Sequence, residues 1–146
     1  MPGIQKRRVF VVDDEPIIAT TLTAILRNHG FDATSFNKPL EAILASRAEA
    51  PDLLIADVMM PQLSGVDLAI QVQDAWPDCK VLLLSGQSLA IDFLENACKT
   101  GHQFEVLTKP VHHTELMRKV QSLMREGSRR PSVIGALGES FVCRSA

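Results

Sequence analysis

Five polar side chains of this sequence each come directly after a short apolar run. With the run that precedes each, they are Asp13 and Asp14 after Arg8–Val12, Asp57 after Leu53–Ala56, Ser85 after Lys80–Leu84, and Lys109 after Phe104–Thr108. In open parallel sheets, binding sites form beyond the carboxyl ends of the strands. If these runs are parallel strands, three carboxylates, a hydroxyl and an ammonium group converge at one edge of one sheet.

Three carboxylates at one edge require a compensating cation. Two carboxylates about 4 Å apart repel each other by roughly 4 kcal/mol at an effective dielectric constant of about 20. Lys109 supplies one positive charge, and an oxygen-only cluster without His or Cys suits Mg²⁺, which keeps some of its waters. We therefore expect a magnesium-dependent phosphate site at this edge.

Each group has a distinct task in such a site. The Asp57 carboxylate is the candidate nucleophile, which would take a phosphoryl group as an acyl phosphate. Mg²⁺ and Lys109 would neutralise the charge on the transferred phosphoryl oxygens. The Ser85 hydroxyl could donate a hydrogen bond to one of these oxygens.

Taken alone, each motif also has an ordinary structural explanation. The acids and proline of residues 13–16 fit the start of a helix, and Asp57 before Pro61–Gly65 fits a turn. Ser85-Gly86 fits a loop, and Lys109-Pro110 fits a solvated strand exit. Their joint occurrence at four strand ends is what favours a functional site.

Strands and helices alternate along the first 126 residues. The first three of the apolar runs named above are nearly continuous in Val, Leu, Ile and Phe, which is typical of strands buried on both faces of a parallel sheet. The more polar segment Asp32–Phe36 fits an edge strand. Apolar spacing and cap residues predict five helices: one over 17–26 ending at Gly30, one opening at Pro39 with Leu40, Ile43 and Leu44, one over Val66–Trp76 after a Ser64 cap, one over Ser88–Lys99, and one over Thr114–Glu126. This alternation predicts a single α/β domain with a mainly parallel sheet and right-handed crossovers.

The composition of the 146 residues excludes several classes of protein. Hydrophobic residues make up 46% and charged residues 22%, which is ordinary for a soluble globular domain and excludes disorder over most of the chain. The net charge of −2 argues against a dedicated nucleic-acid binder, and no apolar run approaches the ~20 residues of a membrane span. Three scattered cysteines outside any CxxC pair fit a reducing compartment, so we expect a cytoplasmic protein.

The motifs occur in an order and spacing that resembles one known family. The segments VVDDEP, DVMMPQLSG from Asp57 to Gly65, LLLSG with Ser85 and LTKP with Lys109 are similar to those of response-regulator receiver domains of two-component signalling. The resemblance covers about residues 6–126. It implies a flavodoxin-like (βα)5 three-layer sandwich, with a parallel five-stranded sheet of order 2-1-3-4-5, over a receiver domain of residues 1–126.

The resemblance also implies a role for each motif residue. Asp57 would accept a phosphoryl group from a sensor histidine kinase or a phosphotransfer protein, in a reaction that depends on Mg²⁺. The remaining implied roles are Asp14 as a direct Mg²⁺ ligand, Asp13 as a ligand through water, Met59 as a ligand through its backbone carbonyl, Ser85 as the switch hydroxyl, Lys109 as the partner of the phosphoryl group, Pro110 as the second residue of a cis peptide bond, and Pro61 and Gly65 as structural residues.

Two features depart from, or add to, the family pattern. Receivers of this type usually carry Tyr or Phe three residues before the lysine, where this chain has Val106, and its nearest aromatic residue there is Phe104. Because a valine displaces less volume than an aromatic ring, we expect a smaller output signal at this position or one that uses another element. Residues 127–146 change in composition, with several Gly and Ser residues, and we expect them to form a tail without an output domain.

The sequence leaves three functions open. The first is a stand-alone receiver that changes its protein-binding surface, that acts on an unknown downstream protein rather than on DNA, and for which a phosphorylation-linked homodimer stays open. The second is a degenerate receiver that serves as a phosphorylation-independent scaffold. The third is a small Mg²⁺-dependent phosphohydrolase, for which Met59 stands where a second carboxylate would be needed. The first is expected to catalyse only its own phosphorylation and slow dephosphorylation.

Overall fold

The computed structural model of the chain describes residues 6–86, 104–126 and 140–142. Its strands are β1 (Arg8–Val12), β2 (Asp32–Phe36), β3 (Leu53–Asp57), β4 (Lys80–Ser85), β5 (Glu105–Thr108) and β6 (Ser140–Val142). Its helices are α1 (Pro16–Asn28), α2 (Pro39–Ala48), α3 (Gly65–Ala75) and α5 (His113–Glu126). The helix predicted over Ser88–Lys99 lies outside the described residues.

The strands form one sheet of order β2-β1-β3-β4-β5-β6. Strands β1 to β5 pair in parallel, which confirms the predicted flavodoxin-like order 2-1-3-4-5. The polar strand β2 lies at one edge, as its composition predicted, with β1 as its neighbour. Parallel pairing brings the carboxyl ends of β1, β3, β4 and β5 to the same edge of the sheet.

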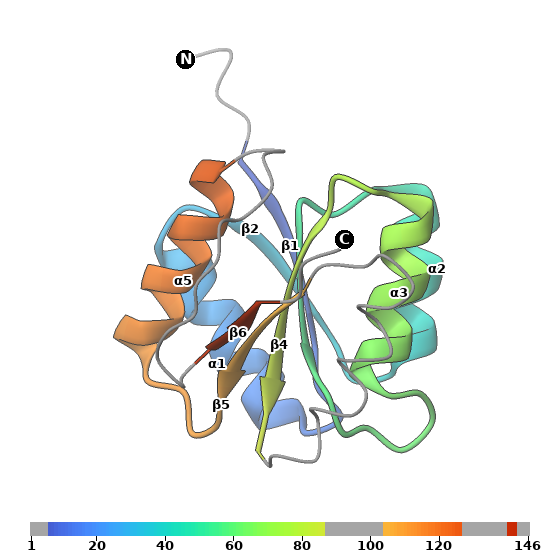
Figure 1. Cartoon of the computed structure of the whole chain (residues 1–146), viewed down its shortest axis with the longest axis horizontal. Coiled ribbons are helices and arrows are strands. Elements are labelled where there is room, and N and C mark those ends of the chain that lie inside the picture. The colour runs from blue at the N-terminus through green and yellow to red at the C-terminus, as the bar shows by residue number, and fades with distance from the viewer. Residues whose placement is uncertain (1–5, 87–103, 127–139, 143–146) are drawn as a thin grey trace.

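Two helical layers cover the two faces of the sheet (Figure 1). Helices α2 and α3 lie on one side, and α1 and α5 lie on the other. The central strand β3 serves both layers, because Leu54 and Ala56 belong to the core under α2 and α3, whereas Leu53 and Ile55 belong to the core under α1 and α5. All five residues of β3 are buried, which holds the strand that ends at Asp57 in a rigid setting.

Local sequence signals fix where the helices begin. Pro16 and Pro39 are the first residues of α1 and α2, where a missing N–H leaves no helical bond unmade. The Ser64 side chain accepts a hydrogen bond from the Asp67 N–H at 3.1 Å and caps α3, as the sequence predicted.

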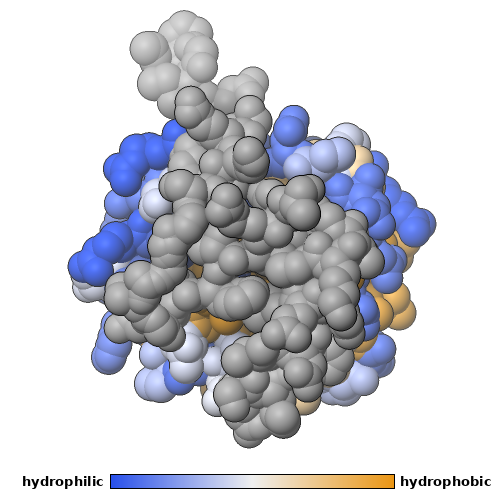
Figure 2. All heavy atoms as spheres, in the orientation of Figure 1, coloured by the Kyte–Doolittle hydropathy of each residue, from blue (hydrophilic) through white to orange (hydrophobic). Residues whose placement is uncertain are grey.

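The outer surface of α5, at the left of the view, is hydrophilic (Figure 2).

The structure differs from the sequence prediction in two places. Residues 140–142 of the tail form a sixth strand, β6, which pairs antiparallel with β5, so the sheet is not limited to five parallel strands. In α2, Ile43 is buried, but Leu40 and Leu44 are 56% and 62% exposed, because the helix turns its Ala42 and Ile43 face to the sheet. None of the helices in the described ranges is both long enough and apolar enough to cross a bilayer.

Candidate functional site

Three carboxylates meet at the carboxyl edge of the sheet. Asp13 and Asp14 follow β1, and Asp57 is the last residue of β3, which pairs directly with β1. One carboxylate oxygen from each of the three lies within 4.8 Å of the others. The predicted convergence therefore occurs. Asp13 and Asp57 are buried, whereas Asp14 is exposed to solvent.

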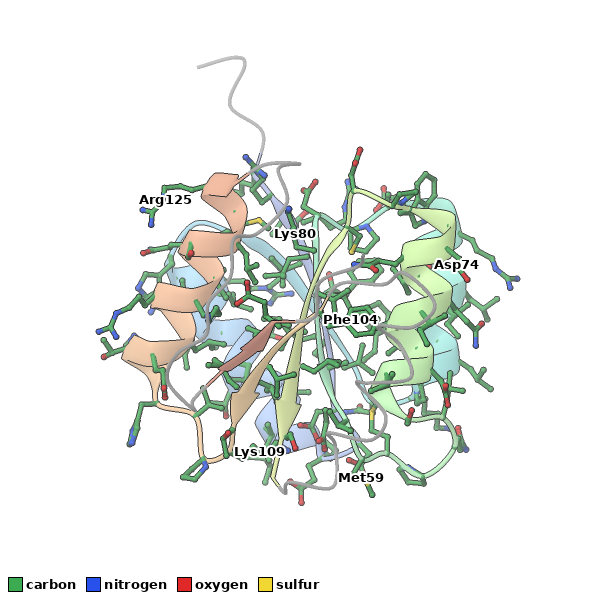
Figure 3. The ribbon with its side chains drawn as sticks, viewed as in Figure 1. Met59, Asp74, Lys80, Phe104, Lys109 and Arg125 are labelled. Carbon is green, nitrogen blue, oxygen red and sulfur yellow. The ribbon has the colours of Figure 1, made fainter. Side chains whose placement is uncertain are left out.

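Lys109 brings a positive charge into this cluster from β5. Its Nζ lies 3.2 Å from Asp57 Oδ2 and 3.6 Å from Asp13 Oδ2. Its backbone N–H donates to the Ser85 carbonyl at 2.8 Å, which ties the end of β5 to the end of β4. The Lys109–Pro110 peptide bond is cis, as the family resemblance implied. Figure 3 shows Lys109 and Met59 at this end of the sheet and Lys80 at the opposite end.

The Asp13 carboxylate is buried, and its two oxygens differ in their hydrogen bonds. Its side chain is 1% exposed, and its Oδ1 accepts a hydrogen bond from the Glu15 N–H at 2.9 Å. Its Oδ2 has no hydrogen-bond partner among the described residues and lies within ion-pair distance of Lys109. Burial raises the pKa of Asp13 above its ordinary value, against the lowering effects of the Glu15 N–H and Lys109. Such an oxygen is ready to bind a cation.

The raised pKa of Asp13 predicts how stability depends on pH when divalent ions are removed. The pKa of Asp13 is higher in the folded chain than the 3.8 of an ordinary aspartate, so the folded state binds the proton more tightly. The destabilisation from the buried charge is then absent below pH 3.8 and fully present above the raised pKa. We expect Asp13→Asn to raise the Tm by a few degrees at pH 7 in a chelator, and the gain to shrink toward pH 4. Thermal unfolding followed by circular dichroism measures this.

Asp52→Asn is the matched control for this prediction. Asp52 lies at the opposite end of β3 and accepts a hydrogen bond from the Arg8 N–H at 2.7 Å, which an Asn side-chain oxygen can also accept. Its Tm should follow that of the unmodified chain across the pH range. A Tm of Asp13→Asn at or below that of the unmodified chain at pH 7 would contradict the prediction.

The loop after β3 is built around the backbone of Asp57. The Met59 N–H points to Asp57 Oδ1 over a long 3.4 Å, and the Gly65 N–H donates to the Val58 carbonyl at 2.9 Å, which closes the loop. A Cβ on Gly65 would overlap the carbonyl of Asp57. Gly65 is therefore the residue that allows α3 to begin directly against the phosphoacceptor candidate. Pro61 is exposed in the same loop.

Ser85 and Asn37 complete the surroundings of the carboxylates. Ser85, the last residue of β4, is 5% exposed and lies beside the backbone of Lys109. The Asn37 side-chain amide points to the Asp13 carbonyl at 3.5 Å, and the Asp13 N–H donates to the Phe36 carbonyl at 3.1 Å. No part in the site was predicted for the end of β2. Asn37 directly after the edge strand was the signal that could have indicated one.

An apolar hollow of about 500 Å³ adjoins Lys109. It lies between α1 and the segment after β5, and Ile17 at its rim is 80% exposed. The residues that line it are Ile17, Ile18, Thr21, Leu22, Leu84, Gly86, Lys109, Pro110 and Val111. No local sequence pattern indicates this surface, because its members come from segments far apart in the chain that meet only in the folded structure.

A family model for the response regulator receiver domain matches residues 9–121 of the chain. The chain belongs to this family. The match covers β1 from Val9, the whole of β2 to β5, and every residue of the carboxylate and lysine cluster. The family membership that the sequence motifs indicated is thus confirmed.

Curated relatives of this receiver are longer than the chain. The probable transcriptional regulatory protein TcrX of Mycobacterium tuberculosis is 32% identical over 117 residues, which are 80% of this chain and 49% of TcrX. The DNA-binding response regulator MtrA of Mycolicibacterium smegmatis is 29% identical over 134 residues, which are 92% of this chain and 58% of MtrA. The chain spans about half the length of these relatives.

Solved structures of receiver domains share the fold. A response regulator receiver domain protein of Clostridium thermocellum is 27% identical, with a TM-score of 0.71 over 82% of this chain and 95% of that one. The chemotaxis protein CheY4 of Vibrio cholerae is 20% identical, with a TM-score of 0.73 over 82% of this chain and 99% of CheY4. At that identity, the likeness to CheY4 shows the fold alone.

Proposed function

We propose that this receiver accepts a phosphoryl group on Asp57 from a sensor histidine kinase or a phosphotransfer protein. The observation that carries the proposal is the placement of Lys109 Nζ 3.2 Å from Asp57 Oδ2, beside two further carboxylates. In this position, the Asp57 carboxylate offers a nucleophilic oxygen. The Lys109 ammonium group beside it offers positive charge to the incoming phosphoryl oxygens. The phosphorylated chain then acts as a two-state switch.

Besides a bound Mg²⁺, the transfer would use only the groups at this edge and the donor. A bond forms between phosphorus and a carboxylate oxygen of Asp57, and the bond from phosphorus to the donor nitrogen breaks, with the electron pair and a proton going to the donor imidazole. Lys109 moves from the carboxylate to a phosphoryl oxygen as negative charge accumulates there. The hydroxyl of Ser85, at the end of the neighbouring strand β4, donates a hydrogen bond to another phosphoryl oxygen.

The donor set suits a magnesium ion. Asp13, Asp14 and Asp57 supply oxygens within 4.8 Å of one another, and the backbone carbonyl of Met59 would be the further protein ligand. Asp13 Oδ2 is one of two buried side-chain oxygens without a hydrogen-bond partner in the described part of the chain, and the one that lies in this cluster, as expected of a cation ligand. When bound, Mg²⁺ supplies positive charge that offsets the negative charge of the three carboxylates and of the phosphoryl group.

The apolar hollow beside Lys109 supports a protein as the phosphoryl donor. Ile17 is 80% exposed at its rim, next to the phosphoacceptor site. An exposed apolar surface of this kind favours docking of an apolar partner surface. We propose a protein as the output partner as well, because the net charge of −2 lacks the basic excess that is typical of DNA-binding chains.

A phosphorylation-independent scaffold is the second candidate, and Val106 favours it. Val106 is 7% exposed in the core under α2 and α3, at the position where receivers of this type usually carry an aromatic ring. A valine side chain that moves displaces less volume than a ring. The two candidates differ in their need for Mg²⁺, because a scaffold requires no ion at Asp13, Asp14 and Asp57.

Transfer from a small nitrogen–phosphorus donor tests the proposal. With phosphoramidate and Mg²⁺, we expect one phosphoryl group per chain, because Asp57 and Lys109 are already paired at 3.2 Å. Phosphorus NMR should show an acyl phosphate that neutral hydroxylamine releases. Asp57→Asn should give no signal, whereas Asp52→Asn, the same change at the opposite end of β3, should react as the unmodified chain does. A hydroxylamine-stable adduct or an equal signal from Asp57→Asn would contradict the proposal.

A further inference from the structure

The outer edge of β5 is covered by a segment far along the chain. β6 (Ser140–Val142) pairs antiparallel with β5, in a register that sets Glu105 opposite Val142, Val106 opposite Phe141 and Leu107 opposite Ser140. Figure 1 shows β6 as a short arrow beside β5. A strand edge left open would present a row of unpaired N–H and C=O groups. The pairing with β6 satisfies part of that row.

We propose that the β5 edge is a strand-addition site, that residues 140–142 of the same chain are its resident occupant, and that phosphorylation of Asp57 weakens their hold. The last part rests on the proposed function. Release of β6 would open the edge to an extended segment of a partner protein, which binds through backbone hydrogen bonds. The tail is then a regulatory strand of the receiver.

The position of β5 between the site and β6 provides the coupling. Leu107 pairs with Leu84 on one side of β5 and with Ser140 on the other. Two residues later, Lys109 pairs with Asp57 and donates its backbone N–H to the Ser85 carbonyl at 2.8 Å. The observed register between β5 and β6 therefore belongs to the unphosphorylated state, in which Lys109 binds the free carboxylate of Asp57. A phosphoryl group that draws Lys109 to a new position favours a different placement of β5, and so lowers the population of this register.

The composition of β5 is typical of a strand whose edge is sometimes open. Glu105, its first residue, is 8% exposed and forms an ion pair with Lys119 of α5 at 2.8 Å. Inward-pointing charges of this kind are one means by which proteins keep exposed edge strands from pairing with other chains. Glu105 is the first residue of β5, opposite Val142, so its charge opposes pairing at one end of the strand and leaves Val106 and Leu107 able to pair with a partner segment.

The shortness of β6 makes it an exchangeable occupant. A three-residue strand makes few backbone hydrogen bonds and would bind weakly as a separate peptide. The link to α5 raises its effective concentration at the β5 edge. At about 3.5 Å per residue, the chain between Glu126 and Ser140 is long enough to return to β5 within one molecule. The cis occupant is therefore favoured over a second copy at low protein concentration.

Hydrogen exchange on the whole 146-residue chain tests the assignment of the occupant. Phe141→Pro removes a backbone N–H from β6 and opposes pairing, whereas Ser145→Pro makes the same change beyond β6. We expect Phe141→Pro to lower the protection of the β5 amides that face β6 at least tenfold, with α1 and β1 unaffected. Ser145→Pro should match the unmodified chain. Equal β5 protection in all three chains, or protection that rises with protein concentration as a dimer forms, would overturn the assignment.

The same measurement with acetyl phosphate and Mg²⁺ tests the coupling. We expect the protection of β6 and of the facing β5 amides to fall at least threefold in the phosphorylated chain and to stay unchanged in Asp57→Asn. Intact mass of the same samples separates the two possible failures. A phosphoryl adduct without a change in protection would overturn the coupling and leave the proposed function standing. Absence of the adduct would overturn the proposed function, and with it the coupling, while the Phe141→Pro result still decides the occupant.

Discussion

Gly65→Ala should lower the free energy of unfolding by about 3 kcal/mol, the upper part of the range for overpacked sites. The added Cβ would overlap the carbonyl oxygen and carbonyl carbon of Asp57, which are backbone atoms of the central strand β3 and cannot rotate away. Helix propensity alone would favour alanine over glycine here by roughly 1 kcal/mol. The predicted sign is therefore opposite to the one that the sequence suggests. Urea unfolding followed by circular dichroism measures it.

Gly86→Ala is the matched control at the same edge of the sheet. Among the described residues, a Cβ there would meet only Lys109 Cδ, at 4.0 Å, which is ordinary van der Waals contact. We expect its free energy of unfolding to stay within about 0.5 kcal/mol of the unmodified chain. If Gly65→Ala were equally mild, the close approach of α3 to Asp57 would not constrain the site. Gly65→Ala should also slow phosphorylation, because the strain acts on the residue that accepts the phosphoryl group.

Lys109→Met should destabilise the chain by about 2 kcal/mol in the presence of a chelator. Lys109 Nζ lies 3.2 Å from Asp57 Oδ2 and 3.6 Å from Asp13 Oδ2, and both acids are buried. Removing one partner of a fully buried ion pair destabilises a protein by about 3–5 kcal/mol. The Lys109 side chain is 26% exposed, so solvent reduces that figure. Urea unfolding with and without Mg²⁺ measures the effect, which Mg²⁺ should largely reverse.

A double variant identifies the cause of that destabilisation. Asp13→Asn removes one of the charges that Lys109 offsets, so the two changes together should destabilise less than the sum of their separate effects. Lys80→Met, at the opposite end of the sheet (Figure 3), controls for the loss of a lysine as such. Strict additivity of Asp13→Asn and Lys109→Met, or an equal effect of Lys80→Met, would show that the charge cluster is not the cause.

The sequence predicted the parallel sheet well because strands that are buried on both faces appear as nearly continuous apolar runs. Strands β1 and β2 begin and end as their residue patterns predicted, whereas β3 and β4 each continue one residue further, to Asp57 and Ser85. Apolar patterns end at a polar residue, but the backbone pairing of β3 with β4 includes Asp57. Two polar residues of the site, Asp57 and Ser85, are thus parts of the strands themselves, and the backbone pairing positions them directly.

Other features depend on contacts that no local pattern records. β6 contains three residues of a tail rich in Gly and Ser, and its pairing with β5 depends on where the chain returns in space. The need for glycine at position 65 arises because α3 begins against the backbone of Asp57. The exposure of Leu40 and Leu44 depends on how α2 is rotated against the sheet. Periodicity identifies a helix but does not settle which of two apolar faces is covered.

The measurement that tests the central claim most directly is intact mass after incubation with acetyl phosphate, with and without Mg²⁺. The samples are the unmodified chain, Asp57→Asn and Asp52→Asn, each shown to be folded by circular dichroism. We predict an added mass of one phosphoryl group on the unmodified chain and on Asp52→Asn, and only with Mg²⁺. Reduction by borohydride should locate the acyl phosphate at position 57. No adduct under any condition, or an adduct that survives Asp57→Asn, would contradict the account and leave the scaffold as the better explanation of this receiver.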